Sequence, residues 1–242
     1  MRLATFAPRT ASAAVAVLVD ETMAAMGAAM LAAMGAIAVT VAIPTGIAHA
    51  DTYTDFTRAM ASDNTKTVSQ LIARGVDPNT VNEKGEPALL YAAREGTTEM
   101  VRALIRGKAN VNIRNPQGDT PIMLAALGGN LATVKALREA RAEINHPGWT
   151  PLQYAAFNGH DAVVEYLVSS GADLGLTAPN GATPVMLAVL SNKADTVKLL
   201  VSYGFDVDAR NDKGETALDI ARSKGFSEIE RLLRGPPPAS RR

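Results

Sequence analysis

The sequence predicts an all-α solenoid of about six helix-turn-helix units joined by hairpin loops. One phrase recurs five times, as GEPALLYAA, GDTPIMLAA, GWTPLQYAA, GATPVMLAV and GETALDIA. Its first residue is Gly85, Gly118, Gly148, Gly181 and Gly214 in turn, so the steps are 33, 30, 33 and 33 residues. A near-constant period of this length is typical of stacked repeats that each consist of one small unit. Such a fold favours binding over catalysis.

Each repeat opens with a signal for the start of a helix. A threonine hydroxyl there can accept a hydrogen bond from the free N–H groups of the first turn, and a following proline lacks only an N–H that has no helical partner. The threonines are Thr120, Thr150, Thr183 and Thr216. The alanine pair that follows lets neighbouring helices lie close together. Apolar residues at helical spacing, such as Val163, Val164 and Leu167, then predict a second helix that packs on adjacent units.

The middle repeats depart from this pattern. Gly75, Gly171 and Gly204 stand where a second helix should end in a left-handed residue, but Lys108 and Arg141 take that place in the second and third units. We expect each to cost about 1 kcal/mol if the geometry is kept. In addition, Pro87 replaces a capping threonine, Arg138 replaces an apolar residue, and three residues are missing from 144–148. The sequence therefore predicts a less stable centre.

The stretch GWTPLQYAAFNGHDAVVEYLVSSGADL around Thr150 resembles the ankyrin repeat in phrase and in length. The resemblance extends over 52–235, because a divergent first unit at 56–79 keeps the Leu-Ile, Gly and Asn landmarks. It implies an ankyrin-repeat domain at 51–235 whose partner is another protein. The family's histidine after leucine is absent in every unit. Basic and acidic residues balance at 24 each, whereas a dedicated nucleic-acid binder is usually basic, so we expect no nucleic-acid partner.

The N-terminus is typical of an export signal. Residues 23–44 are uncharged and rich in Ala, Met and Val, and the following IAHA is a small-x-small cleavage site. We predict a signal peptide at 1–50 that is cut after Ala50, and a periplasmic protein. Two alternatives stay open, namely a retained membrane anchor and a translation start at Met23. The Pro-rich residues 236–242 are expected to form a disordered tail.

The sequence offers no constellation for catalysis or for a metal. The predicted mature chain has no cysteine and two histidines, His146 and His160, without the spacing of a zinc site. His160 follows a glycine at a turn and is expected to bond to the backbone. We predict that the protein is not an enzyme and takes no cofactor or metal.

The candidate binding residues lie in three neighbouring units. In the ankyrin family, contacts come from the hairpin tips and from the exposed side of the first helices, which line a concave face. The residues predicted to form the centre of that surface are Leu127, Trp149, Phe157 and Leu190, with Asp119, His146 and Asn158 around them. Exposed apolar residues and tryptophan are typical of interfaces. Trp149 has an alternative role, in which it folds over the shortened hairpin and fills space.

Three functions fit this surface. The first is a periplasmic adaptor that binds another exported protein. The second is an inhibitor or immunity-type protein that occludes an exported enzyme. The third is a structural component held at the membrane by an uncleaved leader. The oligomeric state stays open.

Overall fold

The computed structural model describes residues 47–234, with side chains from Thr52 onward. In this part of the chain it contains twelve α-helices and no sheet, only one isolated β-bridge between Val81 and Pro87. The helices form six consecutive pairs, as the sequence predicts: α2 (Ile47–Ala61) and α3 (Thr65–Ala73), α4 (Ala88–Glu95) and α5 (Thr98–Arg106), α6 (Pro121–Leu127) and α7 (Leu131–Glu139), α8 (Pro151–Asn158) and α9 (Asp161–Ser169), α10 (Pro184–Leu190) and α11 (Ala194–Ser202), α12 (Ala217–Lys224) and α13 (Ser227–Arg234).

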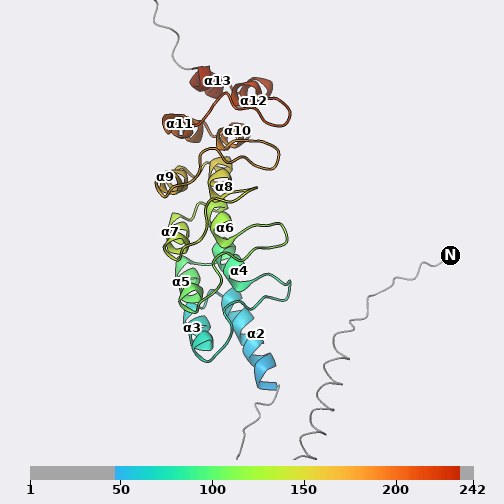
Figure 1. Cartoon of the computed structure of the whole chain (residues 1–242). Coiled ribbons are helices and arrows are strands. Elements are labelled where there is room, and N and C mark those ends of the chain that lie inside the picture. The colour runs from blue at the N-terminus through green and yellow to red at the C-terminus, as the bar shows by residue number, and fades with distance from the viewer. Residues whose placement is uncertain (1–46, 235–242) are drawn as a thin grey trace, which may run out of the picture. The chain divides into compact units, whose positions relative to one another are not determined.

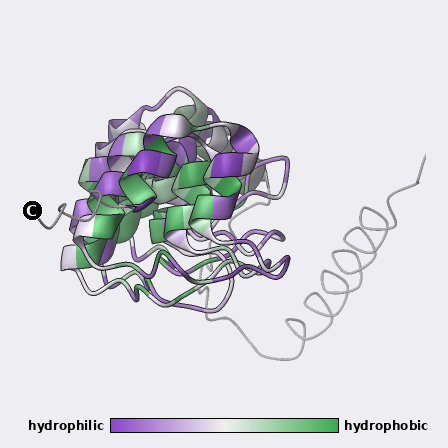
Figure 2. Cartoon of the chain, turned by 90° about the horizontal axis from the view of Figure 1, so that it is seen from above, coloured by the Kyte–Doolittle hydropathy of each residue, from purple (hydrophilic) through white to green (hydrophobic). Residues whose placement is uncertain are grey.

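The pairs stack into two rows of helices with hairpins on one side (Figure 1). The first helices α4, α6, α8, α10 and α12 each pack on the next, and the second helices α3 to α13 form a parallel row. Figure 2 shows hydrophobic residues gathered between the rows and hydrophilic residues in the hairpins and on the outer sides. Because each helix is short, its apolar side is buried only by stacking on neighbouring units. The core therefore runs the length of the repeat array.

The threonine signals mark the starts of the first helices. The hydroxyls of Thr150, Thr183 and Thr216 accept hydrogen bonds from the N–H groups three residues ahead, at 3.1 to 3.3 Å. Pro87 is the N-cap residue before α4 and makes no side-chain cap, as predicted. Thr120 differs from the prediction: its hydroxyl is buried without a partner, while its N–H donates to the sulfur of Met123 at 3.2 Å. A thioether thus stands where a polar side chain would complete the cap.

The ends of the second helices confirm the expected left-handed geometry. Gly171 has φ of 88°, and Lys108 and Arg141 adopt 70° and 67° at the equivalent positions. Residues with a Cβ are sterically disfavoured in this region. The repeat therefore imposes its geometry on two residues that do not favour it.

The close stacking depends on small residues. Ala125, Ala126, Ala155 and Ala156 are fully buried at the contacts of the first helices. A Cβ on Gly129 would lie 2.5 Å from the ring of His160, the residue directly before α9. Larger residues at these positions would force adjacent units apart.

The hairpins are held by asparagines. Asn82, Asn115 and Asn211 each accept from the backbone N–H four residues ahead and donate through Nδ2 to the carboxylate there. The hairpin before α8 is three residues shorter and has no equivalent asparagine, so Figure 1 shows a smaller loop there. Asn145 ties this short connection to the next unit, where its Oδ1 accepts from the N–H of Asp173 at 2.9 Å.

The predicted leader and tail lie almost wholly outside the described residues. Helix α2 begins at Ile47, so it includes the expected cleavage position after Ala50. Among the side chains described, from Thr52 onward, the first in the core is Phe56, and Tyr53 donates a hydrogen bond to the carbonyl of Val81 at 2.7 Å. Both contacts use residues after Ala50. Within residues 47–234 no helix has the length and apolar character needed to cross a membrane.

Candidate protein-binding surface

Three apolar side chains occupy equivalent positions at the C-terminal ends of α6, α8 and α10. We call them the central stripe: Leu127, Phe157 and Leu190. Phe157 is 41% and Leu190 39% exposed, and Leu127 is half-buried. The equivalent residue in α4 is Arg94, whose guanidinium contacts Glu86 of its own hairpin at 2.7 Å. The central stripe therefore lies along the side of the first helices that borders the hairpins.

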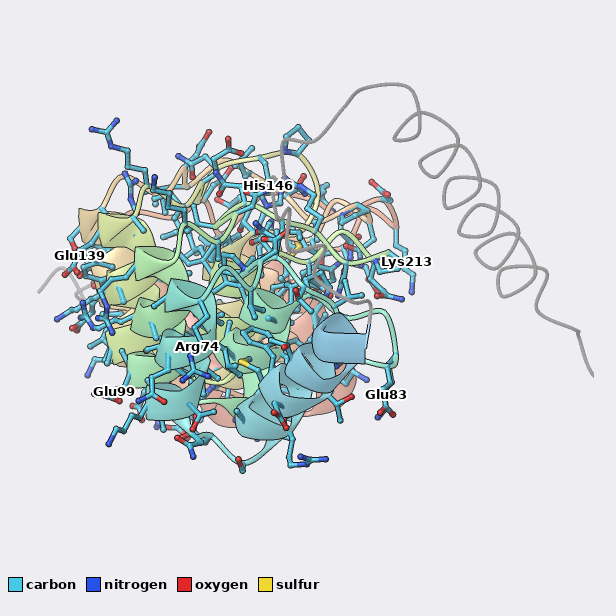
Figure 3. All side chains as sticks on the ribbon, turned by 90° about the horizontal axis from the view of Figure 1, so that it is seen from below. Arg74, Glu83, Glu99, Glu139, His146 and Lys213 are labelled. Carbon is cyan, nitrogen blue, oxygen red and sulfur yellow. The ribbon has the colours of Figure 1, made fainter. Side chains whose placement is uncertain are left out.

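The helices that carry the central stripe contain no Asp, Glu, Lys, Arg or His. Their sequences are PIMLAAL, PLQYAAFN and PVMLAVL. The flanking first helices differ: in α4 Arg94 pairs with Glu86 and Glu95, and in α12 Arg222 pairs with Glu230 at 3.1 Å. Four of the charged side chains labelled in Figure 3 lie at the periphery, Glu99 and Glu139 on the second-helix side, Glu83 and Lys213 on the hairpin side. An uncharged apolar stripe between charged ends suits an apolar partner surface.

Trp149 belongs to a network next to the central stripe. It packs half-buried on the core, and its ring lies 5.2 Å from that of Tyr154 at an angle of 32°. The Tyr154 hydroxyl donates to Asp119 of the preceding hairpin at 2.5 Å. Burial, and then the bond and charge of Asp119, raise the pKa of Tyr154 well above its usual value. Asp119 also accepts from Asn115 at 2.9 Å, so its carboxylate has a structural role.

The polar residues of the predicted site make different contacts within the fold. His146 is only 9% exposed, and its Nδ1 donates to the carbonyl of Pro147 at 3.1 Å while Nε2 is buried without a partner. Asn158 donates to the carbonyl of Leu127 at 2.6 Å. His160 donates to the same carbonyl at 3.0 Å, so its expected backbone bond is confirmed. These contacts join units three and four and leave the central stripe as the accessible apolar part.

Two residues of this region escaped the sequence analysis. Tyr154 is the residue before the alanine pair, a position that is Tyr91 in the second unit and Leu or Ile in the third, fifth and sixth, and only the fold places it against Trp149. Gln153 replaces the family's histidine: it accepts from the N–H of Thr150 at 3.0 Å and donates to the carbonyl of Leu176 at 3.1 Å. The signal in the sequence was a polar glutamine at a position that is apolar in the second, third and fifth units.

No three side chains among His, Cys, Asp and Glu in the described part of the chain lie close enough together to hold a metal ion. The titratable groups near the central stripe are engaged in bonds within the fold. The arrangement therefore offers shape and apolar area for binding.

Comparison with known proteins decides the family. The model for "Ankyrin repeats (3 copies)" matches three overlapping segments, 56–147, 107–178 and 152–238. The chain belongs to the ankyrin-repeat family. Ankyrin repeats generally mediate protein–protein interactions, and ankyrin-repeat proteins are typically binding scaffolds without enzymatic activity.

Two curated relatives share part of this array. The chain is 45% identical over 49 residues to "Ankyrin repeat and SAM domain-containing protein 6" of Mus musculus and to the protein of that name from Rattus norvegicus. The match covers 20% of this chain and 6% of each relative. This likeness concerns the repeats alone.

Proposed function

We propose that this ankyrin-repeat protein is a periplasmic adaptor that binds another exported protein through the central stripe. The observation that carries the proposal is the alignment of Leu127, Phe157 and Leu190 on three adjacent units. Exposed apolar residues in a row lower solubility, and a patch of this kind is typical of an interface. The repeat scaffold holds the three side chains in fixed order because each unit is packed on the next.

The chemistry of the stripe defines its partner. A charged side chain brought onto α6, α8 or α10 would lose its hydration and meet no opposite charge on these helices. The favoured partner surface is therefore uncharged and apolar, such as one face of a helix. We expect the affinity to change little between low and high salt, because screening acts on charge pairs.

The proposal of export is supported by the leader sequence, and cleavage after Ala50 is compatible with two contacts of the described fold. Tyr53 and Phe56 follow Ala50, so a chain that begins at Asp51 keeps both contacts. N-terminal sequencing of the protein from a cell envelope fraction tests this directly. Asp51 as first residue supports export with cleavage, whereas the original N-terminus would favour the membrane-tethered alternative.

A pair of matched substitutions tests the stripe. Phe157 on α8 and Tyr203 at the end of α11 are exposed to 41% and 40%, on the first-helix and second-helix rows. We expect Phe157→Ala to abolish capture of the partner from a periplasmic extract and Tyr203→Ala to leave capture unchanged. Thermal unfolding of both variants should stay close to that of the parent, because exposed side chains contribute little to stability.

The result that contradicts the proposal is equal capture by all three proteins. Trp149→Ala is a poorer test, because that ring packs on the core and on Tyr154. Its removal would lower the stability of the fold as well as any binding, and the two effects could not be separated. The captured protein, once identified by mass spectrometry, distinguishes an adaptor from an inhibitor. An enzyme whose activity falls upon binding would favour the inhibitor.

A further inference from the structure

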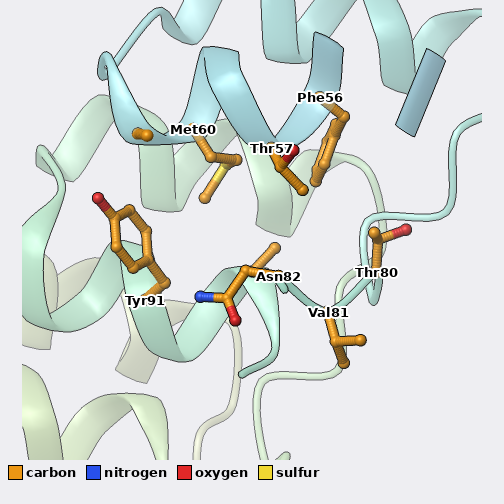
Figure 4. A pocket seen from close by; sticks show the side chains of 9 residues that line it. Phe56, Thr57, Met60, Thr80, Val81, Asn82 and Tyr91 are labelled. Atoms are coloured by element: carbon orange, nitrogen blue, oxygen red, sulfur yellow. The ribbon is translucent and has the colours of Figure 1, made fainter. Parts of the chain in front are cut away.

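A small apolar pocket lies between the first two repeats, away from the central stripe. It has a volume of about 70 Å³, which is several times the roughly 10–15 Å³ needed by one water molecule. We call it the first-repeat pocket. Its lining is Phe56, Thr57, Met60, Ala61, Thr80, Val81, Asn82, Ala88 and Tyr91, seven of which are labelled in Figure 4. The pocket is thus enclosed by α2, α4 and the hairpin between the repeats.

The pocket lies where α2 packs only weakly on α4. Met60 lines it and occupies the place of the second alanine of the pair, where α4, α6 and α8 have Ala93, Ala126 and Ala156 and α10 has Val189. Helix α2 packs mainly on α3, and the space that remains beside α4 is the first-repeat pocket. Val81 of its lining and the neighbouring Tyr53 are 43% and 37% exposed, and within residues 47–234 no helix covers them.

Apart from the hydroxyl of Tyr91, the polar side chains of the pocket are already bonded within the fold. Asn82 bonds to Glu86 through both ends of its amide, and Thr80 donates to the carbonyl of Asp77 at 2.6 Å. Thr57 donates to backbone carbonyls of α2, and the carbonyl of Val81 accepts from Tyr53. A ligand with several backbone N–H groups would find only the Tyr91 hydroxyl as a free side-chain acceptor here. Proline has no N–H, so a run of prolines avoids this cost.

The chain contains one such run, Gly235-Pro-Pro-Pro-Ala-Ser-Arg-Arg242, directly after α13. Proline-rich segments dock as extended helices into aromatic-lined grooves, and the pocket offers Phe56, Tyr53 and Tyr91 at or beside its walls. Four residues from Arg234 reach at most about 14 Å. Five helix spacings of about 8–10 Å separate α12 from α2, so the prolines of the same molecule cannot reach the pocket.

We propose that the first-repeat pocket binds the Pro236–Pro238 segment of a second copy of this chain. The contact joins the C-terminal end of one molecule to the N-terminal end of the next. Such a head-to-tail contact leaves a free pocket and a free tail at the two ends, so it extends to chains whose length rises with concentration. The central stripe stays accessible in every copy.

A labelled synthetic peptide of sequence GPPPASRR tests the pocket by fluorescence anisotropy with the purified protein. The control peptide GAAAASRR keeps both arginines, so it has the same charge. We expect the control to bind at least about tenfold more weakly, since it restores three N–H groups and loses the rings. Equal binding of the two peptides, or binding of neither, would overturn the proposal.

A matched pair of variants locates the peptide. Ala61 and Ala73 are the exposed last residues of α2 and α3 in the same repeat, but only Ala61 lines the pocket. Ala61→Phe should reduce peptide binding at least about tenfold, while Ala73→Phe should not change it. Circular dichroism confirms that both variants are folded. Unchanged binding to Ala61→Phe would place the peptide elsewhere and refute the site.

Sedimentation velocity of the purified chain tests the assembly. The mean mass should rise with protein concentration in the parent and stay that of a monomer when all three prolines are replaced by alanine. A parent that stays monomeric above the dissociation constant of the peptide would refute the head-to-tail contact. So would association that persists in the alanine variant. Neither result bears on the central stripe.

Discussion

Lys108 and Arg141 hold left-handed backbone conformations that glycine adopts without strain. Their φ values are 70° and 67°, and neither side chain makes an ion pair or a hydrogen bond among the described residues. The left-handed region costs a residue with a Cβ about 1–2 kcal/mol. Glycine in turn lowers stability by about 0.5–1 kcal/mol relative to alanine, because it has more conformational freedom in the unfolded chain. We therefore expect Lys108→Gly and Arg141→Gly to raise the free energy of unfolding by about 0.5–1 kcal/mol each.

The reverse change provides the control. Gly171 has φ of 88° at the equivalent position of a later unit, and a Cβ there would meet no atom within 4 Å. Gly171→Ala therefore changes the backbone preference without a steric clash. It should lower the free energy of unfolding by about 1 kcal/mol, the opposite sign from the other two substitutions.

Urea unfolding followed by circular dichroism measures all three variants and the Lys108→Gly/Arg141→Gly double variant. The double variant should gain about 1–2 kcal/mol, and its melting temperature should rise by about 2–4 °C per kcal/mol. The two sites lie in different units without shared partners, so their effects should add. Destabilisation by Lys108→Gly, or no effect of Gly171→Ala, would show that the backbone conformation does not limit the stability of these units.

Three further outcomes follow from the contacts between units. Tyr154→Phe should lower the free energy of unfolding by about 1–2 kcal/mol, because the hydrogen bond to the Asp119 carboxylate is lost. In the parent, stability should fall above about pH 10, because the tyrosine ionises in the unfolded chain while its raised pKa keeps it protonated in the folded chain; the variant should show less of this fall. Equal pH profiles of the two proteins would contradict this. Gly129→Ala should cost about 2–3 kcal/mol in urea unfolding, more than a strain-only change, because its Cβ would clash with His160. Hydrogen exchange should be faster in 107–148 than in 183–220, and uniform protection would refute the weak centre.

Much of the fold could be predicted because each landmark acts locally. A threonine cap, an alanine pair and a glycine at a helix end depend on neighbours within a few residues, so their spacing alone gives six helix pairs. Lys108 and Arg141 could be recognised as strained because glycine occupies the same place in other units. Thr120 failed as a cap because its hydroxyl has no partner, whereas Thr150 at the equivalent position accepts from the N–H three residues ahead, and this difference is a detail of side-chain geometry.

The candidate site was less predictable because its residues meet across units. Position in the repeat was enough to indicate that Phe157 and Leu190 face outward. It was not enough for His146, whose burial depends on how the short hairpin folds, or for Asp119, which is engaged by Tyr154 of the next unit. Asp119 and Tyr154 are 35 positions apart and belong to adjacent units, and nothing in the pattern of a single repeat indicates that they are in contact.

The two surfaces available for binding both lie where the repeat pattern is relaxed. Repeat landmarks such as the alanine pairs are buried in contacts between units, so a partner cannot reach them. Variation is free at outward positions, which gives the central stripe, and in the first repeat, where α2 packs mainly on α3 and leaves the first-repeat pocket beside α4. Met60 is 6% exposed and lines this pocket, so Met60→Ala should remove part of its apolar wall, weaken binding of the GPPPASRR peptide and cost about 2–5 kcal/mol in urea unfolding. A variant that binds the peptide as tightly as the parent would show that this wall does not contact the peptide.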